Sequence, residues 1–242
     1  MHPLLFKFGP FTVYAYGFMV AVAYIVGVYL ATIKARQEKL NPEIIFNLSF
    51  IVFIAGIIGA RLFYVLENLA YYIDNPLEII MLHHGGLAWF GGFIFGVFFG
   101  IVYLKKKRIP VLATFDLIVP YLSLSQAIGR VGCLLNGCCF GKEAEWGIYF
   151  IVHRKFLIPT QMFSSLILLI IFIALRFYQD KPHRTGRIFF AYLILYSLKR
   201  FFIEFLRADN PVVFYSLTLF QLLSIGLFLL GLAGFLFVRE SK

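Results

Sequence analysis

The stretch VLATFDLIVPYLSLSQAIGRVGCLL, residues 111–135, is apolar for long enough to cross the roughly 30 Å hydrocarbon core of a bilayer, yet it contains Asp116 and Arg130. Insertion of such a charged side chain near the centre of a spanning helix costs about 2.5–3.5 kcal/mol, so these residues usually face a polar interior and mark function. The stretch therefore predicts a membrane helix that turns its charges toward other helices.

The rest of the chain has the same character. Of its 242 residues, 61% are hydrophobic and only 14% are charged, whereas soluble proteins have about 45–50% and about 25%. We expect an all-α integral membrane protein, a bundle of about seven transmembrane helices that forms a single transmembrane domain over residues 1–242. The predicted spans lie at about 15–34, 44–66, 87–104, 111–135, 157–178, 186–206 and 215–238. Because only Lys7 precedes the first window and no small-residue cleavage pattern follows it, we expect a true span there and not a signal peptide.

The basic residues predict the orientation of the chain. The net charge of +10 could suggest nucleic acid as a partner, but lysines and arginines cluster in short loops between alternate spans, such as KKKR at 105–108. The loop at 67–86 contains acidic residues and no lysine or arginine. Cytoplasmic loops are enriched in lysine and arginine, so we expect the amino terminus outside, the carboxyl terminus in the cytoplasm and no nucleic-acid partner. The longest external segment, about 136–157, predicts a short strand or an interfacial aromatic belt.

A second charged stretch, YSLKRFFIEFLRAD at 196–209, lies in the sixth predicted span. Tyr196, Arg200, Glu204 and Arg207 recur at helical spacing and therefore share one helix face. Glu204 can pair with both arginines, and an excess of positive charge remains for an anionic ligand. A buried ion network that only holds helices together is the alternative at this point.

The predicted topology places Arg61, Arg130 and Arg207 toward the external ends of their helices. Tyr16 and the turn HHGGLAWFGG at 83–92 have the same predicted depth. Guanidinium groups bind phosphate oxygens in bidentate geometry, so we expect the headgroup of an outer-leaflet phospholipid here.

All three cysteines lie in AIGRVGCLLNGCCFGK at 127–142. There is no C-x-x-C pair of the kind that redox sites use, and His83 and His84 are not placed by sequence to complete a metal site. We therefore interpret the cysteines as small packing residues and expect no metal and no cofactor. Asn136 and Gly141 accompany Arg130 in this glycine-rich break, which favours an anion cradle.

An ordered series of motifs gives the chain a resemblance to a known family. The motifs are HPLLFKFGP at 2–10 with YG at 16–17, GARLFYVLEN at 59–68, NP at 75–76 with GGLAWFGG at 85–92, FDLIVP at 115–120, GR at 129–130 with NG at 136–137, PTQMF at 159–163 and RFFIEFLRAD at 200–209. Over nearly its whole length the chain resembles bacterial phosphatidylglycerol–prolipoprotein diacylglyceryl transferases, in particular members with GCC in the signature.

The resemblance implies a seven-helix enzyme of the bacterial cytoplasmic membrane. It would transfer the diacylglyceryl group of phosphatidylglycerol to the lipobox cysteine of a preprolipoprotein signal peptide and release glycerol phosphate. Carried over by position, Arg130 and Arg200 are the expected catalytic residues. The expected substrate-binding residues are Tyr16, Arg61, Arg130, Asn136, Gly141, Tyr196, Glu204 and Arg207.

Some positions depart from the family pattern. Phe90 and Ile158 stand where the family has histidines, Ser164 stands in place of a glutamate, and Cys133 in place of an asparagine. The base that deprotonates the substrate thiol therefore stays open among His83, His84, Glu204 and water. Three alternative functions also stay open, namely an anionic lipid or solute binding or transport protein, a diverged homologue without transferase activity, and a thiol oxidoreductase.

Overall fold

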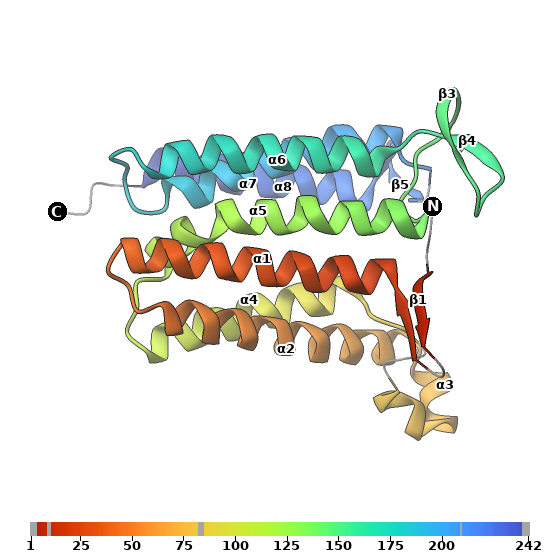
Figure 1. Ribbon diagram of the computed structural model, residues 1–242, viewed down its shortest axis with the longest axis horizontal. Helices are drawn as coiled ribbons and strands as arrows, with labels where there is room; N and C mark the ends of the chain where they lie inside the picture. The colour runs from red at the N-terminus through yellow and green to blue at the C-terminus, as the bar shows by residue number, and fades with distance from the viewer. Residues whose placement is uncertain (1–3, 9–10, 82–84, 209, 239–242) are drawn as a thin grey trace. The chain divides into compact units, whose positions relative to one another are not determined.

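The computed structural model describes residues 4–8, 11–81, 85–208 and 210–238. This part of the chain is mainly helical and contains no closed sheet, which confirms the all-α prediction. Each predicted apolar window corresponds to one long helix (Figure 1). These helices are α1 (Ala15–Gln37), α2 (Pro42–Glu67), α4 (Trp89–Lys106), α5 (Val111–Asn136), α6 (Thr160–Gln179), α7 (Arg187–Leu206) and α8 (Leu219–Phe237).

Five helices of the described part are long and apolar enough to cross a membrane, by length and composition. They are α1, α2, α5, α6 and α8. The charged side chains of the helix face predicted from 196–209 interrupt the apolar sequence of α7. The chain is thus a membrane protein of helical type, and the count of seven spans stays a prediction.

The chain forms two compact units. One consists of Met1–Ala31 together with Leu112–Lys242, and the other of Thr32–Val111. In the smaller unit, α2 and α4 lie side by side (Figure 1). Their backbones approach closely at Gly59 and Gly91, since a Cβ atom added at Gly91 would lie 2.2 Å from the carbonyl oxygen of Gly59. Small residues at such crossings let helices pack in lipid. In the chain, α2 is followed by the short helix α3 (Leu69–Asp74) and the 3₁₀ helix η1 (Pro76–Ile80), and α4 comes after them.

In the larger unit, α5 packs against α6 and α7 through a buried core. Val119 of α5, Ile171 and Leu175 of α6, and Ile188 and Tyr192 of α7 form this core. Backbone carbonyls accept hydrogen bonds across the helix interface, as between Ser165 Oγ and the Ala127 oxygen at 2.9 Å. Interhelical bonds of this kind replace the hydrophobic driving force that lipid does not supply.

The intramembrane charge of Asp116 has a structural explanation. Its Oδ1 accepts a hydrogen bond of 2.7 Å from the Phe189 amide, and its Oδ2 accepts one from the Gly186 amide. Asp116 therefore caps the amino terminus of α7 from a neighbouring helix, where a carboxylate is also favoured by the helix dipole.

Three two-stranded antiparallel hairpins complete the described fold. They pair β1 (Leu4–Phe8) with β2 (Phe11–Tyr14), β3 (Glu143–Phe150) with β4 (Lys155–Leu157), and β5 (Val212–Phe214) with β6 (Leu217–Thr218). The β3–β4 hairpin lies within the segment 136–157, so the strand interpretation of that segment is confirmed.

Candidate active site

Tyr196, Arg200 and Glu204 of the charged face predicted for 196–209 lie on α7, and their centre is the buried carboxylate of Glu204. The prediction was wrong for Arg207, because α7 ends at Leu206 and Arg207 follows it in extended backbone. One oxygen, Oε1, accepts hydrogen bonds from Asn210 Nδ2 at 2.6 Å and Thr218 Oγ1 at 2.9 Å. The other, Oε2, lies 3.1 Å from Arg200 Nη2 and 4.0 Å from Arg207 Nε. Because both oxygens already have close polar neighbours, Glu204 is a poor choice for the base that the sequence left open.

Thr218 is held in position for this contact by the start of α8. Its hydroxyl accepts the Gln221 amide hydrogen bond at 3.3 Å, and Gln221 Oε1 accepts the Thr218 amide hydrogen bond at 2.9 Å. The two residues thus form a capping box. The helix start therefore supplies a donor to Glu204 that the pattern 196–209 alone could not reveal.

Further basic side chains lie near Arg200 and Arg207. Arg200 lies with its Cζ atom 4.4 Å from the centre of the Phe220 ring. Lys199 is buried, and its Nζ atom lies 4.8 Å from the centre of the Tyr196 ring. Lys199 also interacts electrostatically with Arg130, Arg200 and Arg207. We call Arg130, Lys199, Arg200 and Arg207 the cation cluster.

The cation cluster contains one residue that the sequence prediction left out of the site. Lys199 belongs to the quoted stretch 196–209, but it falls off the face that the spacing of Tyr196, Arg200 and Glu204 defines. Its burial beside the Tyr196 ring was not visible in that spacing. Arg200 and Arg207 share the single carboxylate of Glu204, and Arg130 interacts electrostatically with Arg200. The resulting excess of positive charge favours the binding of an anion.

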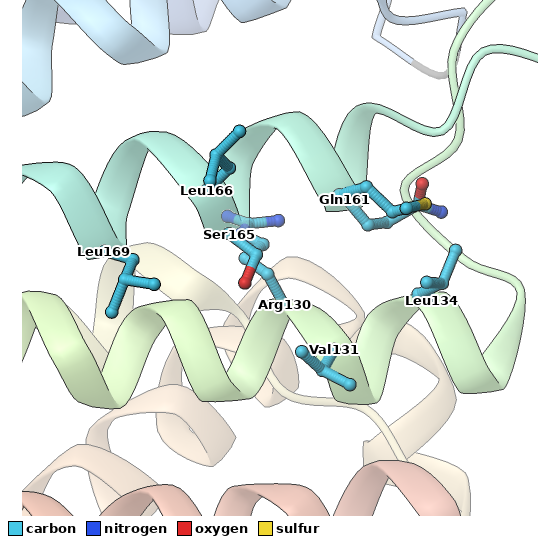
Figure 2. A pocket seen from close by; sticks show the side chains of 8 residues that line it. Arg130, Val131, Leu134, Gln161, Ser165, Leu166 and Leu169 are labelled. Atoms are coloured by element: carbon cyan, nitrogen blue, oxygen red, sulfur yellow. The ribbon is translucent and has the colours of Figure 1, made fainter.

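Arg130 lines a pocket between α5 and α6 with a volume of about 300 Å³ (Figure 2). The guanidinium extends from α5 toward Ser165 and Leu166 of α6. Among the described residues it makes no side-chain hydrogen bond or ion pair. The pocket thus combines an arginine fork that pairs with none of the described residues and a mostly apolar wall. Its other lining residues are Val131, Leu134, Gln161, Met162, Ser165, Leu166 and Leu169.

Gln161 is a pocket residue that the sequence prediction did not single out. It lies at the start of α6, within the motif PTQMF, which was the one available signal. Its Nε2 donates to the Cys138 carbonyl oxygen at 2.6 Å. Its Oε1 is buried and accepts no hydrogen bond from any residue of the described ranges.

The loop after α5 is fixed by the start of α6. Thr160 Oγ1 donates to the Cys139 carbonyl oxygen at 2.6 Å, as Gln161 does to Cys138. Gly137 and Cys139 have left-handed backbone, with φ of 77° and 62°. The pKa of the Cys139 thiol is lowered, because the Cys133 and Cys138 thiols donate hydrogen bonds to it and Arg207 and Arg130 add positive charge. Asn136, the last residue of α5, also interacts with this loop through a hydrogen bond to the Cys138 side chain.

Gly141 joins this loop to the end of α7. It forms an antiparallel bridge with Arg207, and its amide donates to the Ile158 carbonyl oxygen at 2.9 Å. A Cβ atom here would lie 2.7 Å from the Leu206 carbonyl oxygen. Gly141 was predicted to bind substrate, and what the structure shows is a close backbone contact that positions Arg207.

Tyr16 lies in the first turn of α1, which packs closely on α5. A Cβ atom added at Gly132 of α5 would lie 2.8 Å from Met19 Cβ. Tyr16 is 46% exposed and interacts electrostatically with Arg130 and with all three cysteines. The structure therefore places Tyr16 near one member of the cation cluster, Arg130, and the predicted role of Tyr16 in substrate binding stays a prediction.

Arg61 belongs to the smaller unit, and its donors are used there. It is buried, and it donates to the carbonyl oxygens of Ile79 at 2.9 Å and Gly86 at 3.0 Å. Further acceptors are the carbonyl oxygens of Glu78, Met81 and Gly85. Arg61 thus holds the loop that connects η1 to α4. Its predicted role in substrate binding stays a prediction, and His83 and His84 lie outside the described residues.

Comparison with known proteins identifies the family of the chain. The family model described as prolipoprotein diacylglyceryl transferase matches residues 3–237. A phosphatidylglycerol–prolipoprotein diacylglyceryl transferase of Clostridium tetani is 34% identical, with 100% of both chains covered. Proteins of the same name from Trichormus variabilis and Staphylococcus carnosus are 34% and 32% identical, each over 98% of this chain and 90% of the relative. The chain belongs to the prolipoprotein diacylglyceryl transferase family.

Proposed function

We propose that this protein transfers the diacylglyceryl group of phosphatidylglycerol to the lipobox cysteine of preprolipoproteins in the bacterial cytoplasmic membrane. The observation that carries the proposal is the Arg130 guanidinium, which has no ion-pair partner among the described residues and lines an apolar pocket. A phospholipid has the matching parts, since its phosphate is anionic and its acyl chains are apolar. The cation cluster and the family to which the chain belongs support the same substrate.

Arg130 is proposed to hold the phosphate, and Arg200 to stabilise charge as the bond breaks. The Arg200 fork lies beside Glu204, yet Glu204 Oε2 accepts no hydrogen bond from the described residues. The N–H groups of Arg200 therefore do not point at the Glu204 carboxylate, and they can donate hydrogen bonds to another acceptor. A preorganised cation in a site of low dielectric stabilises developing negative charge without reorganisation.

The reaction is a displacement at carbon. The thiolate sulfur attacks a glycerol carbon of the diacylglyceryl group, and a thioether bond forms as the bond from this carbon to the phosphate oxygen breaks. The electron pair leaves with glycerol phosphate, and the thiol proton passes to a base or to water. Two arginines can share the charge of the leaving phosphate through paired hydrogen bonds.

Other polar groups are proposed to orient the headgroup. Gln161 lines the pocket, and its free Oε1 can accept a hydrogen bond from a headgroup hydroxyl. Tyr16, Asn136 and Tyr196 are proposed to contact the substrates, whereas Gly141 and Glu204 act by positioning Arg207 and Arg200. This division follows from their observed backbone and ion-pair contacts.

The orientation of the chain is part of the proposal. The amino terminus is placed outside and the carboxyl terminus in the cytoplasm, because basic loops such as 105–108 favour the cytoplasmic side. In a variant without its own cysteines, a single cysteine introduced at Lys106 should resist an impermeant reagent in intact cells. Efficient labelling there would reverse the proposed orientation.

The function is tested with the purified protein in phosphatidylglycerol liposomes and a lipobox peptide. We expect lipidated peptide and glycerol phosphate in equal amounts. A peptide with serine in place of cysteine should give neither product. Binding of phosphatidylglycerol without formation of either product would favour a diverged lipid-binding homologue and would contradict the transferase proposal.

A further inference from the structure

The three cysteines of the chain bring their sulfur atoms together at one place. Their Sγ atoms all lie within 4.8 Å of one another. Cys133 comes from the last turn of α5 and is buried, while Cys138 and Cys139 follow in the loop and are partly buried. We call these three residues the cysteine cluster. Transfer of a diacylglyceryl group uses the sulfur of the substrate protein and leaves this cluster without a role.

The backbone holds the cysteine cluster in place. The Cys138 amide donates to the Cys133 carbonyl oxygen at 3.1 Å, which folds the loop back on α5. Cys139 has φ of 62°, a conformation that costs a non-glycine residue about 1–3 kcal/mol and persists only where the surroundings enforce it. Here Thr160 and Gln161 supply that enforcement through the Cys139 and Cys138 carbonyl oxygens. The backbone that carries the sulfur atoms is therefore fixed by contacts to carbonyl oxygens, which would persist when the thiols bind an ion.

The spacing of the sulfur atoms suits a metal ion. With metal–sulfur bonds of about 2.3 Å, sulfur ligands around one ion lie roughly 3.8–4.0 Å apart. The sulfur atoms, which lie within 4.8 Å of one another, would need to move by less than about 1 Å. Thiolates select soft ions such as Cu(I) and Zn(II) over ions that prefer oxygen. We propose that Cys133, Cys138 and Cys139 bind one soft, thiolate-binding metal ion.

The charge around the site is consistent with several thiolates. Each cysteine that ligates the ion forms one metal–sulfur bond and releases one proton to solvent, and no electron is transferred. Arg207 and Arg130 interact electrostatically with Cys139. Their positive charge, together with that of the ion, offsets the charge of the thiolates. The inference is independent of the transferase proposal, because it depends on the sulfur geometry alone.

Cadmium is a suitable probe, because its bonds to thiolates add a characteristic ultraviolet absorption. The full-length protein in detergent, kept reduced by a phosphine, is titrated with Cd(II). Since the chain contains only 3 cysteines, any thiolate signal must come from the cluster. We expect one Cd(II) per chain and none in the triple Cys→Ser variant. Each single serine variant should bind at least about 10–100-fold more weakly, because loss of an outer-shell partner alone typically has that effect.

Two further measurements keep the test decisive. Met162, a sulfur-containing residue that lines the neighbouring pocket, provides the matched control, and Met162→Leu should bind Cd(II) like the wild type. One equivalent of Cd(II) should protect all three thiols of the wild type from a maleimide, as mass spectrometry would show, even if the triple variant does not fold. Absence of thiolate absorption, equal binding by the triple variant, or protection of fewer than three thiols would overturn the proposal.

Discussion

Glu204 and Arg200 form an ion pair one helical turn apart on α7, with 3.1 Å between Oε2 and Nη2. The opposite oxygen of Glu204 accepts hydrogen bonds from Asn210 and Thr218, while Oε2 accepts none from the described residues. Neutral donors thus fix one oxygen of the Glu204 carboxylate, and the positive charge of Arg200 lies beside the other. The ion pair therefore holds Arg200 in position while the N–H donors of Arg200 stay available for a substrate.

We expect Glu204→Gln to lower both activity and stability. The amide keeps an oxygen for Thr218 but removes the charge that balances Arg200 and Arg207. Removal of one partner of a buried ion pair costs about 3–5 kcal/mol, and transferase activity and the unfolding temperature in detergent would measure the effect. Glu143→Gln is the control, because Glu143 pairs with Lys155 at the surface and such pairs contribute about 0–1 kcal/mol. Equal effects of the two variants would contradict the role given to Glu204.

Gly141→Ala should impair the enzyme without touching a charged group. The added Cβ would lie 2.7 Å from the Leu206 carbonyl oxygen, which is backbone and cannot move aside easily. Overpacking of this kind costs about 1–3 kcal/mol, and displacement of Arg207 should also reduce turnover. The control is Gly226→Ala in α8, where a Cβ would meet no atom within 4 Å. Thermal unfolding and the liposome assay should separate the two variants.

Asp116→Ala should destabilise the protein and leave the chemistry intact. The Gly186 and Phe189 amides lose their acceptor at the start of α7, and loss of a helix cap costs about 0.5–2 kcal/mol. Asp116→Asn retains one acceptor oxygen and should recover part of the stability. Unfolding temperatures of the three proteins would test this order, and a variant that unfolds like the wild type but has lost its activity would place Asp116 in the mechanism.

The three cysteines should not be needed for transferase activity. The nucleophilic sulfur belongs to the substrate protein, and the contacts that Cys138 and Cys139 make to α6 use carbonyl oxygens rather than thiols. The triple Cys→Ser variant should therefore retain substantial activity in the liposome assay. A stably folded but inactive triple variant would instead favour the hypothesis that the protein is a thiol oxidoreductase.

Local patterns in the sequence predicted much of this molecule. The apolar windows located the long helices, and helical spacing placed Arg200 and Glu204 on one face of α7. Arg207 follows the end of α7 in extended backbone, and its Nε lies 4.0 Å from Glu204 Oε2. Contacts between distant segments could not be predicted in the same way. Thr218 lies 14 residues from Glu204 and reaches it only because α8 packs on α7.

The same limit applies to individual side chains whose partners are backbone atoms. The carbonyl oxygens that accept hydrogen bonds from Arg61 lie 17 to 25 residues away and could not be predicted from its residue type and depth, while its role in substrate binding stays a prediction. The five-residue spacing of Cys133 and Cys138 likewise gave no indication that their sulfur atoms lie close together. They do so because of a left-handed turn, which has no simple sequence signal. Such features depend on chain reversals and not on periodicity.

Arg130→Lys and Arg200→Lys give the most direct test of the proposed mechanism. Lysine keeps the positive charge but loses the planar fork that binds two phosphate oxygens. Loss of one preorganised charge-stabilising donor typically lowers the rate by about 10²–10³, and we expect a loss of at least that order in each variant. Arg154→Lys in the β3–β4 hairpin is the control, because Arg154 is exposed.

The two variants should also differ in kinetics. If Arg130 mainly holds the headgroup, Arg130→Lys should raise the KM for phosphatidylglycerol, whereas Arg200→Lys should mainly lower kcat, since Arg200 acts on the leaving group. Initial rates over a range of phosphatidylglycerol fractions in the liposomes would separate these effects. Near-normal turnover by folded lysine variants would show that both arginines are structural, because a point charge would then suffice where the mechanism requires a fork.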